Sequence, residues 1–327
     1  MFMGLVGSEM CIRDSPGAMQ VLDFGNSMAS MVQVKAKKGA PITGHKISEL
    51  KDHIPSADTR VAAIYRNNEL IIPTGDDFIE EKDEVFFITA RSNLRKVMSE
   101  IREEDARYKN IMIAGGGRIG RRIAKALEKN FRVKIIEADK ERCIYLSEKL
   151  SNSLVLQGDT SDSELLDEEG IDQIDVFCAV TNNDEANVMS SLLAKRQGAK
   201  NVLTLVNKSN YIELIKDEDL EVSIAPTLIT IGVVLQNVVS SRLANAYSFK
   251  GGKAEALEVI VDIEKNKGLI GKGIDEIKVP EGCMIGALLR DKEVKIAHHD
   301  VKIAENDHLI IFLADKSNFE KLENSLS

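Results

Sequence analysis

Short apolar runs alternate with amphipathic stretches through the middle of the chain. Residues 111–114 (Ile-Met-Ile-Ala) predict a buried strand, and the apolar positions of 121–131 recur at helical spacing. The run 175–180 is almost continuously apolar, which is typical of a strand covered on both faces. Further strands are predicted at 133–136, 154–159 and 201–206. This alternation of strands and helices predicts an α/β domain with a Rossmann-like, doubly wound parallel sheet.

Two segments on either side of this region resemble each other. Each begins with Gly-x-x-Ile-x-Glu followed by Leu or Ile, at 44–50 and 271–277. Each closes with an acidic turn, an apolar strand and a short helix, near 79–101 and 303–326. The pattern predicts two small α+β domains of about 80 residues, each a small sheet with one or two helices.

Polar residues predict turns inside these repeats. Asn67-Asn68 and Arg290-Asp291 have the composition of hairpin turns. Asp83 and Asp307 directly precede the last apolar strand of each repeat. We interpret both as tight-turn residues, and a ligand role is the alternative.

The predicted boundaries divide the chain into five parts. They are a leader at 1–15, a first small domain at 16–104, the Rossmann-like domain at 107–226, a helix at 227–246 and a second small domain at 247–327. The leader lacks a secretory-signal pattern and resembles a translated adapter sequence. Because the repeat opens on the second half of its unit, we expect an N-terminally truncated product. The helix is apolar on more than one stripe, so it is either a crossover and dimer contact or packs within the chain.

The turn after the first predicted strand carries the most specific motif. Gly115, Gly117 and Gly120 form G-x-G-x-x-G between a strand and a helix. The first glycine suits a tight turn, the second lets backbone approach a pyrophosphate, and the third lets helix and strand pack closely. A diphosphate would lie on N–H groups at the positive end of the helix. The candidate cofactor-binding residues of this turn are Gly115, Gly116, Gly117, Arg118, Ile119 and Gly120.

Further candidates lie at the ends of the later strands. Glu137 follows Gly120 by 17 residues, close to the spacing of the acid that binds a ribose diol, so NAD is favoured over NADP. The alternative is a glycine turn without a nucleotide and a solvated Glu137. Asp159 either meets the adenosine end or caps the next helix. Thr181 and Asn182 offer hydroxyl, amide and free backbone N–H groups for ribose and phosphate, whereas the acids at 184–185 suit the first turn of the next helix.

Composition excludes several classes of function. The chain has 327 residues, 43% hydrophobic residues and a net charge of -9, which argues against a nucleic-acid partner and against adhesion to an anionic membrane surface. No apolar run reaches the roughly 20 residues that span a bilayer. The four cysteines are dispersed and without His partners, so no metal site is predicted.

Catalytic machinery is not evident. A dehydrogenase needs a proton donor near the nicotinamide, usually His, Lys or Tyr. Tyr108 and Lys109 lie at the wrong end of the first strand, and nothing pairs with Tyr211. A nucleotide site without such groups favours a sensor over an enzyme.

Several motifs together resemble one known family. Gly-Gly-Gly-Arg-Ile-Gly, Ile-Glu-Ala-Asp-Lys-Glu-Arg, Gln-Gly-Asp-Thr-Ser-Asp and Ala-Val-Thr-Asn-Asn-Asp-Glu-Ala-Asn are similar to the nucleotide-binding RCK-N domain of the RCK/KTN family. The segments 58–66 and 275–282 resemble its RCK-C domains, so the resemblance covers residues 16–327.

The resemblance implies a function and partners. It implies a cytosolic regulator, peripheral on the inner face of the cell membrane, that gates an integral potassium-translocating subunit of Trk type. It implies binding of NAD(H), and in some members ATP or ADP, at Gly115 to Ile119, Glu137, Thr181 and Asn182. Self-association into dimers or a ring is implied as well. The rival hypotheses are an NAD-dependent oxidoreductase and a redox-sensing transcriptional regulator, and the latter would need a basic helix-turn-helix segment.

Overall fold

The computed structural model describes residues 18–55, 57–101, 108–208, 220, 222–224, 243–249, 254–264, 266–298 and 301–326. The chain divides into two compact units, one built around residues 106–227 and one built from the segments on either side. Within the described part of the chain, no helix has the length and apolar character needed to cross a membrane.

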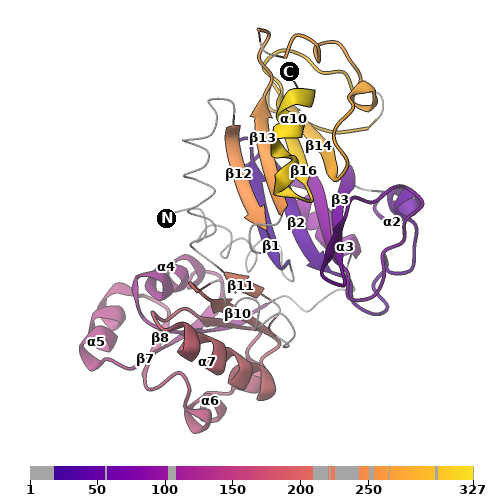
Figure 1. Ribbon diagram of the computed structural model, residues 1–327. Helices are drawn as coiled ribbons and strands as arrows, with labels where there is room; N and C mark the ends of the chain where they lie inside the picture. Colours follow the sequence, from indigo (N-terminus) through magenta and orange to yellow (C-terminus); the bar gives the residue numbers. More distant parts are fainter. Residues whose placement is uncertain are drawn as a thin grey trace. The chain divides into compact units, whose positions relative to one another are not determined.

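The first unit is a doubly wound parallel sheet, as the sequence predicts (Figure 1). The chain runs from the central strand β6 to one side and then crosses back to the other side, giving the order β11-β10-β9-β6-β7-β8. The gap between β6 and β9 is therefore the topological switch point, where such sheets bind ligands. Its elements are β6 (Asn110–Ala114), α4 (Arg118–Leu127), β7 (Arg132–Glu137), α5 (Lys140–Lys149), β8 (Leu154–Gln157), α6 (Ser163–Glu168), β9 (Val176–Ala179), α7 (Asp184–Arg196), β10 (Asn201–Leu205) and β11 (Val222–Ile224).

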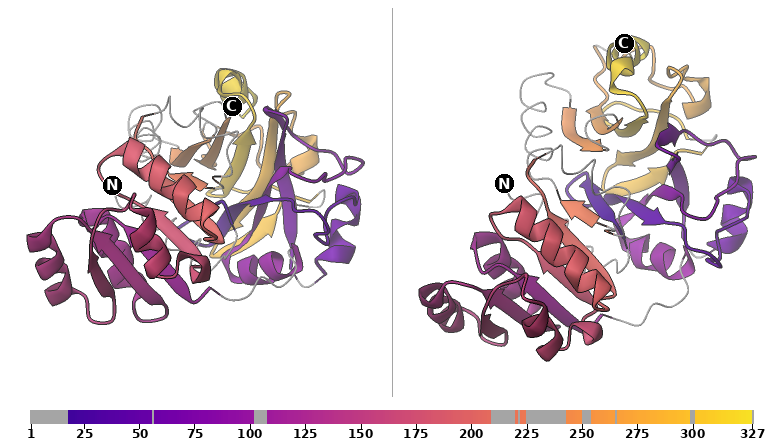
Figure 2. Two further views of the ribbon diagram at one scale, coloured as in Figure 1. Left: turned by 90° about the horizontal axis from the view of Figure 1, so that it is seen from below. Right: turned by 60° about the horizontal axis from the view of Figure 1, so that its bottom comes forward.

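Apolar side chains on both faces of this sheet explain its nearly continuous hydrophobic strands. Ile111 and Ile113 of β6 pack on one face with α4 and α5, and Met112 packs on the other face with α6 and α7. The same alternation holds in β9, where Phe177 and Cys178 point to opposite faces. One layer of helices thus covers each face of the sheet (Figure 2). Cys178 has no exposed surface, and its burial raises the pKa of its thiol to about 12, so it is a core residue.

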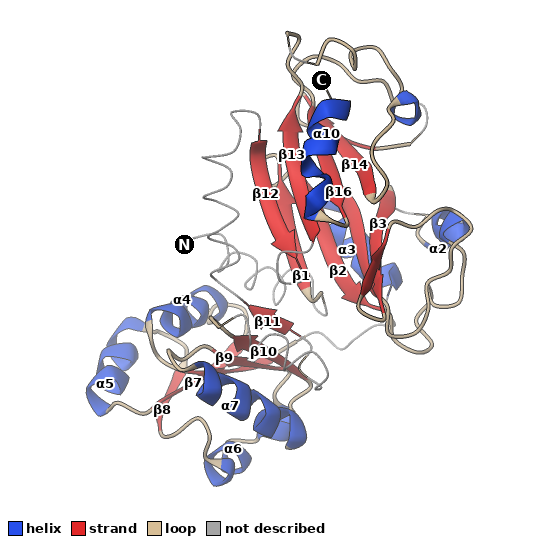
Figure 3. Ribbon diagram, in the orientation of Figure 1, coloured by secondary structure: helices blue, strands red, loops and turns tan. Residues whose placement is uncertain are grey.

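The second unit contains the two repeats, and their sheets have the same topology. The first has the order β1-β2-β5-β3-β4 and the second β12-β13-β16-β14-β15, all pairs being antiparallel. Figure 3 draws the strands of both sheets in red. The strands of the first are β1 (Gln20–Phe24), β2 (Ala29–Lys35), β3 (Thr59–Arg66), β4 (Glu69–Ile71) and β5 (Glu84–Ala90). Those of the second are β12 (Leu243–Phe249), β13 (Ala254–Ile260), β14 (Cys283–Arg290), β15 (Glu293–Ile296) and β16 (His308–Leu313). Short helices accompany them, α2 (Leu50–His53) and α3 (Leu94–Ile101) in the first repeat and α10 (Phe319–Ser325) in the second.

The two repeats share one hydrophobic core. The ring centroids of Phe86 and Phe312 lie 5.6 Å apart. Both residues belong to a single buried cluster, to which strands of both sheets contribute side chains. Polar contacts add to it, since Glu258, 1% exposed, accepts a hydrogen bond from the backbone N–H of Gly25 at 3.0 Å. Because a sheet of about 80 residues has little core of its own, pairing stabilises both repeats.

Turn geometry confirms part of the sequence prediction and corrects part of it. Asn67 and Asn68 both have positive φ, as a two-residue hairpin turn requires. In the second repeat the turn residues are Asp291 and Lys292, so the prediction at Arg290-Asp291 was one residue early. The predicted turn role of Asp83 and Asp307 is confirmed, because each accepts the N–H of the residue three positions before it.

One predicted helix is wrong at its C-terminal end. Residues 243–246, expected to lie in the helix 227–246, begin strand β12 instead. Backbone pairing with β13 outweighs the local apolar pattern here. The rest of that helix, the leader at 1–15 and Tyr211 lie outside the described residues.

Candidate nucleotide-binding site

The glycine turn after β6 is held at the switch point. Gly115 has φ +107°, a conformation that favours glycine, and its N–H donates to Ile136 O of β7 at 2.9 Å. A Cβ at Gly115 would lie 2.9 Å from both Cγ2 and the backbone N of Thr181. The turns that follow β6 and β9 therefore meet at this point, and a side chain would separate them.

The third glycine of the motif allows helix α4 to approach the turn. A Cβ at Gly120 would lie 1.9 Å from the carbonyl oxygen of Gly115, which is a backbone atom and cannot rotate away. This is the close helix–strand packing expected from the motif. Helix α4 begins at Arg118, three residues earlier than predicted, so Gly120 lies in its first turn.

The N-terminus of α4 presents backbone N–H groups directly after the glycine turn. Gly117 is the N-cap residue of α4, and because it is a glycine no side chain accepts the first N–H groups of the helix. A Cβ at Gly117 would lie more than 4 Å from any other atom, so the space beside it is open. The first helical bond runs from Arg121 N to Gly117 O at 3.0 Å, so the N–H groups of Arg118, Ile119 and Gly120 precede the helical ladder. The Arg118 side chain is exposed. These donors, the helix dipole and the guanidinium all favour a phosphate group.

Glu137 is oriented by the backbone on both sides of it. Its Oε2 accepts the N–H of Gly116 at 2.8 Å, and its Oε1 accepts the N–H of Asp139 at 3.0 Å. A carboxylate oxygen has further lone pairs, so both oxygens can still accept a hydroxyl group. The glycine turn thus holds the carboxylate at the end of β7, where the ribose diol of a dinucleotide lies in this fold.

Arg142 on α5 was not among the predicted residues, although it supports the same turn. Its Nε donates to the carbonyl oxygen of Gly116 at 2.8 Å, and its guanidinium lies 4.8 Å from the ring centroid of Tyr145. Gly116 is therefore held by both of its backbone polar groups. The sequence shows an Arg on a helix and gives no sign of this long-range contact.

The polar cluster after β9 is organised differently from the prediction. The backbone N–H of Thr181 is not free, because it donates to Asn187 Oδ1 at 2.8 Å, and the Thr181 hydroxyl donates to the same atom at 2.6 Å. Thr181 lies beside Gly115, and both its N–H and its hydroxyl are turned to Asn187. Asn182 is exposed at the same edge. Asn183 is the N-cap of α7, and Asp184 and Glu185 lie in its first turn, as predicted.

Asp159 follows β8 and does not cap helix α6. Its Oδ1 accepts the N–H and the hydroxyl of Ser161, at 2.8 and 2.6 Å, and these bonds lower its pKa. The cap of α6 is Asp162, which accepts the N–H groups of Glu164 and Leu165. The capping alternative for Asp159 was therefore wrong. Its exposed carboxylate lies at the carboxyl edge of the sheet, where the adenosine end of a nucleotide is expected.

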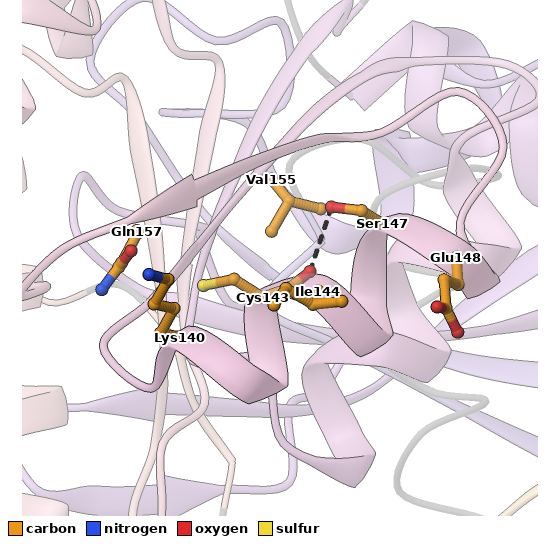
Figure 4. A pocket seen from close by; sticks show the side chains of 7 residues that line it. All are labelled: Lys140, Cys143, Ile144, Ser147, Glu148, Val155 and Gln157. Carbon is orange, nitrogen blue, oxygen red and sulfur yellow. Dashed lines mark hydrogen bonds between the residues drawn. The ribbon is translucent and has the colours of Figure 1, made fainter.

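A separate hollow of about 430 Å³ lies between α5 and the edge strand β8 (Figure 4). It is lined by Lys140, Cys143, Ile144, Ser147, Glu148, Val155 and Gln157. None of these seven is among the predicted site residues, so this hollow is not the predicted cleft. In the described part of the chain no group of three His, Cys, Asp or Glu side chains is arranged to hold a metal ion.

These observations define a class of protein. The first unit is a parallel sheet with a glycine turn at its switch point, and a carboxylate is fixed at the end of the next strand. The chain is thus a Rossmann-type domain combined with two copies of a small antiparallel domain.

Comparison with known proteins places this class in a family. The family model described as the TrkA-N domain matches residues 111–226, and that of the TrkA-C domain matches residues 31–102 and 259–327. The Trk system potassium uptake protein TrkA of Halomonas elongata is 46% identical over 312 residues, 95% of this chain and 68% of that protein. The protein of the same name from Vibrio alginolyticus is 44% identical over 309 residues, again 68% of its length. The chain belongs to the family of Trk system potassium uptake proteins TrkA, of the RCK/KTN type.

Solved structures share the fold. The GsuK RCK domain superposes with a TM-score of 0.53 at 18% identity, covering 95% of this chain and 66% of that one. The GsuK channel bound to NAD superposes with a TM-score of 0.55 at 16% identity, covering 100% of this chain and 58% of that one. At these identities the likeness shows a shared fold.

Proposed function

We propose that this chain is a cytosolic, nucleotide-sensing regulator of potassium uptake that binds NAD(H) at the glycine turn and Glu137. The observation that carries the proposal is the contact between Gly116 N–H and Glu137 Oε2, which fixes a carboxylate beside an open phosphate cradle. A carboxylate there accepts hydrogen bonds from both ribose hydroxyls and repels a 2′-phosphate. NAD(H) is therefore favoured over NADP(H), and ATP or ADP can use the same cradle and ribose contact.

The partner of this regulator is an integral potassium-translocating subunit of Trk type, with the chain bound to its inner face. The family named for potassium uptake supports this partner, and so does the GsuK channel, which has the same fold and was solved with NAD. Gating requires that the nucleotide binds the open and closed arrangements with different affinity. Self-association into dimers or a ring would transmit that difference to the pore.

Calorimetric titration with NADH, NAD and ATP tests the binding step, with nicotinamide absorbance followed over hours. We expect saturable binding without cofactor turnover. Gly117→Val should abolish binding and lower the thermal unfolding temperature by only a few degrees, because the added side chain fills open space and the helix loses only a favourable N-cap residue. Gly75→Val is the matched control, since Gly75 lies in the other unit and its φ is not positive. Unchanged binding by Gly117→Val would refute the site, and oxidation or reduction of the cofactor with a metabolite mixture would favour an oxidoreductase.

The gating step has its own test. The protein is reconstituted in liposomes with a Trk-type membrane subunit, and potassium flux is measured with NADH, with ATP and without nucleotide. A nucleotide-dependent flux that Gly117→Val removes supports regulation through this site. Equal flux under all three conditions contradicts it.

A further inference from the structure

Helix α7 holds the far side of the cleft through a buried amide. Asn187 has no exposed surface, and its Nδ2 donates to the carbonyl oxygens of Leu205 at 2.9 Å and Thr181 at 3.2 Å. Its Oδ1 accepts the N–H and hydroxyl of Thr181. One side chain thus uses its donors and its acceptor to join the ends of β9 and β10 to α7. An unpaired group at this depth would be costly, so the arrangement is strongly specified.

A buried carboxylate one turn earlier in α7, that of Asp184, holds the loop after β10 in a similar way. Asp184 is 5% exposed, and its Oδ2 accepts the backbone N–H groups of Asn207 and Lys208 at 2.9 and 2.8 Å. Its Oδ1 accepts the Asn207 side-chain amide at 2.9 Å. Hydrogen bonds from backbone N–H groups to a carboxylate are charge-assisted and short, so they fix the course of the chain after β10.

These contacts lie on one side of the switch point. Glu137 and the glycine turn serve the β6–β7 side, where the adenosine half of a dinucleotide lies. Because dinucleotides bind across the crevice at the switch point in this fold, the second half would lie over the ends of β9 and β10. The wall there is Thr181, whose Cγ2 already limits the space beside Gly115. Its position is set by Asn187, and that of the loop after β10 by Asp184.

We propose that Asn187 and Asp184 are positioning residues that shape the part of the cleft receiving the second half of a dinucleotide. The inference rests on the proposed function, because it assumes that nucleotides bind at the glycine turn. According to this inference, different residues hold the two sides of the cleft. Contacts to the adenosine half of the dinucleotide depend on Glu137 and the glycine turn, and contacts to the second half depend on Asn187 and Asp184 of α7.

The test compares AMP with NADH by calorimetry, since AMP lacks the second half. We expect Asn187→Ala and Asp184→Ala to raise the Kd for NADH about tenfold or more, from displaced contacts, while the Kd for AMP stays within about twofold. Asp184→Asn should restore NADH binding to within about threefold of the original, because its amide oxygen can accept both backbone N–H groups while the exposed Asn207 amide turns its own oxygen to accept from the new NH2 group. Glu185→Gln is the control on the same helical turn and removes an exposed ion pair with Lys208.

A folding defect is separated from a positioning role by a second variant. Asn207→Gly removes the side-chain bond to Asp184 from an exposed loop and leaves the core intact. This variant should weaken the binding of NADH and leave the binding of AMP unchanged. Equal losses for AMP and NADH in these variants, or no loss for NADH, would overturn the inference while the proposed function stands. If the unchanged protein binds neither nucleotide, the proposed function fails and the inference with it.

Discussion

Arg66 binds Asp83 through two parallel hydrogen bonds, from Nε to Oδ1 at 2.8 Å and from Nη2 to Oδ2 at 2.6 Å. Arg290 binds Asp307 in the same way, at 2.8 and 2.7 Å. Both aspartates are buried, at 1% and 0% exposure, and each also closes the turn before the last strand of its repeat. The repeats therefore share an ion pair that joins the hairpin to the turn, in addition to sequence and topology.

Loss of one partner of this pair should destabilise the second unit. Arg290→Met leaves the carboxylate of Asp307 buried without its guanidinium, and we expect the free energy of unfolding to fall by about 2–3 kcal/mol. The value is below that of a fully buried pair because Arg290 is 31% exposed. Urea unfolding followed by circular dichroism measures it. Lys272→Met, at an exposed position of the same repeat, is the control, and an equal effect of both variants would contradict the role of the pair.

The close approach at Gly120 predicts a structural effect distinct from that of Gly117→Val. Gly120→Ala places a methyl group against the Gly115 carbonyl, so the helix must move away from the turn. We expect a loss of about 2–4 kcal/mol in the free energy of unfolding, together with loss of nucleotide binding. Differential scanning calorimetry and NADH titration measure the two effects. A variant with unchanged stability would show that the helix and the turn do not pack this tightly.

The charge of Glu137 predicts the choice between the two nicotinamide cofactors. Glu137→Ser would remove the two charge-assisted hydrogen bonds that we propose the carboxylate makes to a ribose diol, so we expect the Kd for NADH to rise about 10–100-fold. The repulsion of a 2′-phosphate disappears as well, and the preference for NADH over NADPH should shrink. Parallel titrations with both cofactors measure this change. Glu141→Ser is the control, because Glu141 is an exposed acid in the first turn of α5. An unaltered preference would contradict the assignment of Glu137.

The sequence was sufficient to predict the features that depend on local pattern. Gly115 needs positive φ, Gly120 needs a missing side chain, and Glu137 follows a strand at a known spacing. It could not predict Asn187 or Arg142, whose partners are backbone groups brought near only by the folded sheet. The sequence prediction was also wrong at residues 243–246, where pairing of β12 with β13 outweighs a pattern that is compatible with helix as well.

A buried carboxylate in the first unit predicts a change of stability with pH. Glu128 is 4% exposed, and burial alone would raise its pKa. Four hydrogen bonds outweigh this effect and lower the pKa from 4.5 to about 2. Its donors are the backbone N–H groups of Ser151 and Asn152, the hydroxyl of Ser153 and the ammonium group of Lys125, at 2.9 to 3.1 Å. Glu128 thereby fixes the loop between α5 and β8.

Because the pKa in the folded state lies below that in the unfolded state, the stabilisation is complete above pH 4.5 and is lost as the pH falls toward 2. We expect Glu128→Gln to lower the free energy of unfolding by about 2–3 kcal/mol at pH 7, and the difference from the original protein to shrink by about 2 kcal/mol at pH 3. Urea unfolding at both pH values measures this convergence. Glu148→Gln serves as the control, because Glu148 is exposed on α5. Its replacement should leave the difference in free energy of unfolding from the original protein the same at pH 7 and pH 3. Parallel curves for Glu128→Gln would show that the loop is not held by an ionised carboxylate.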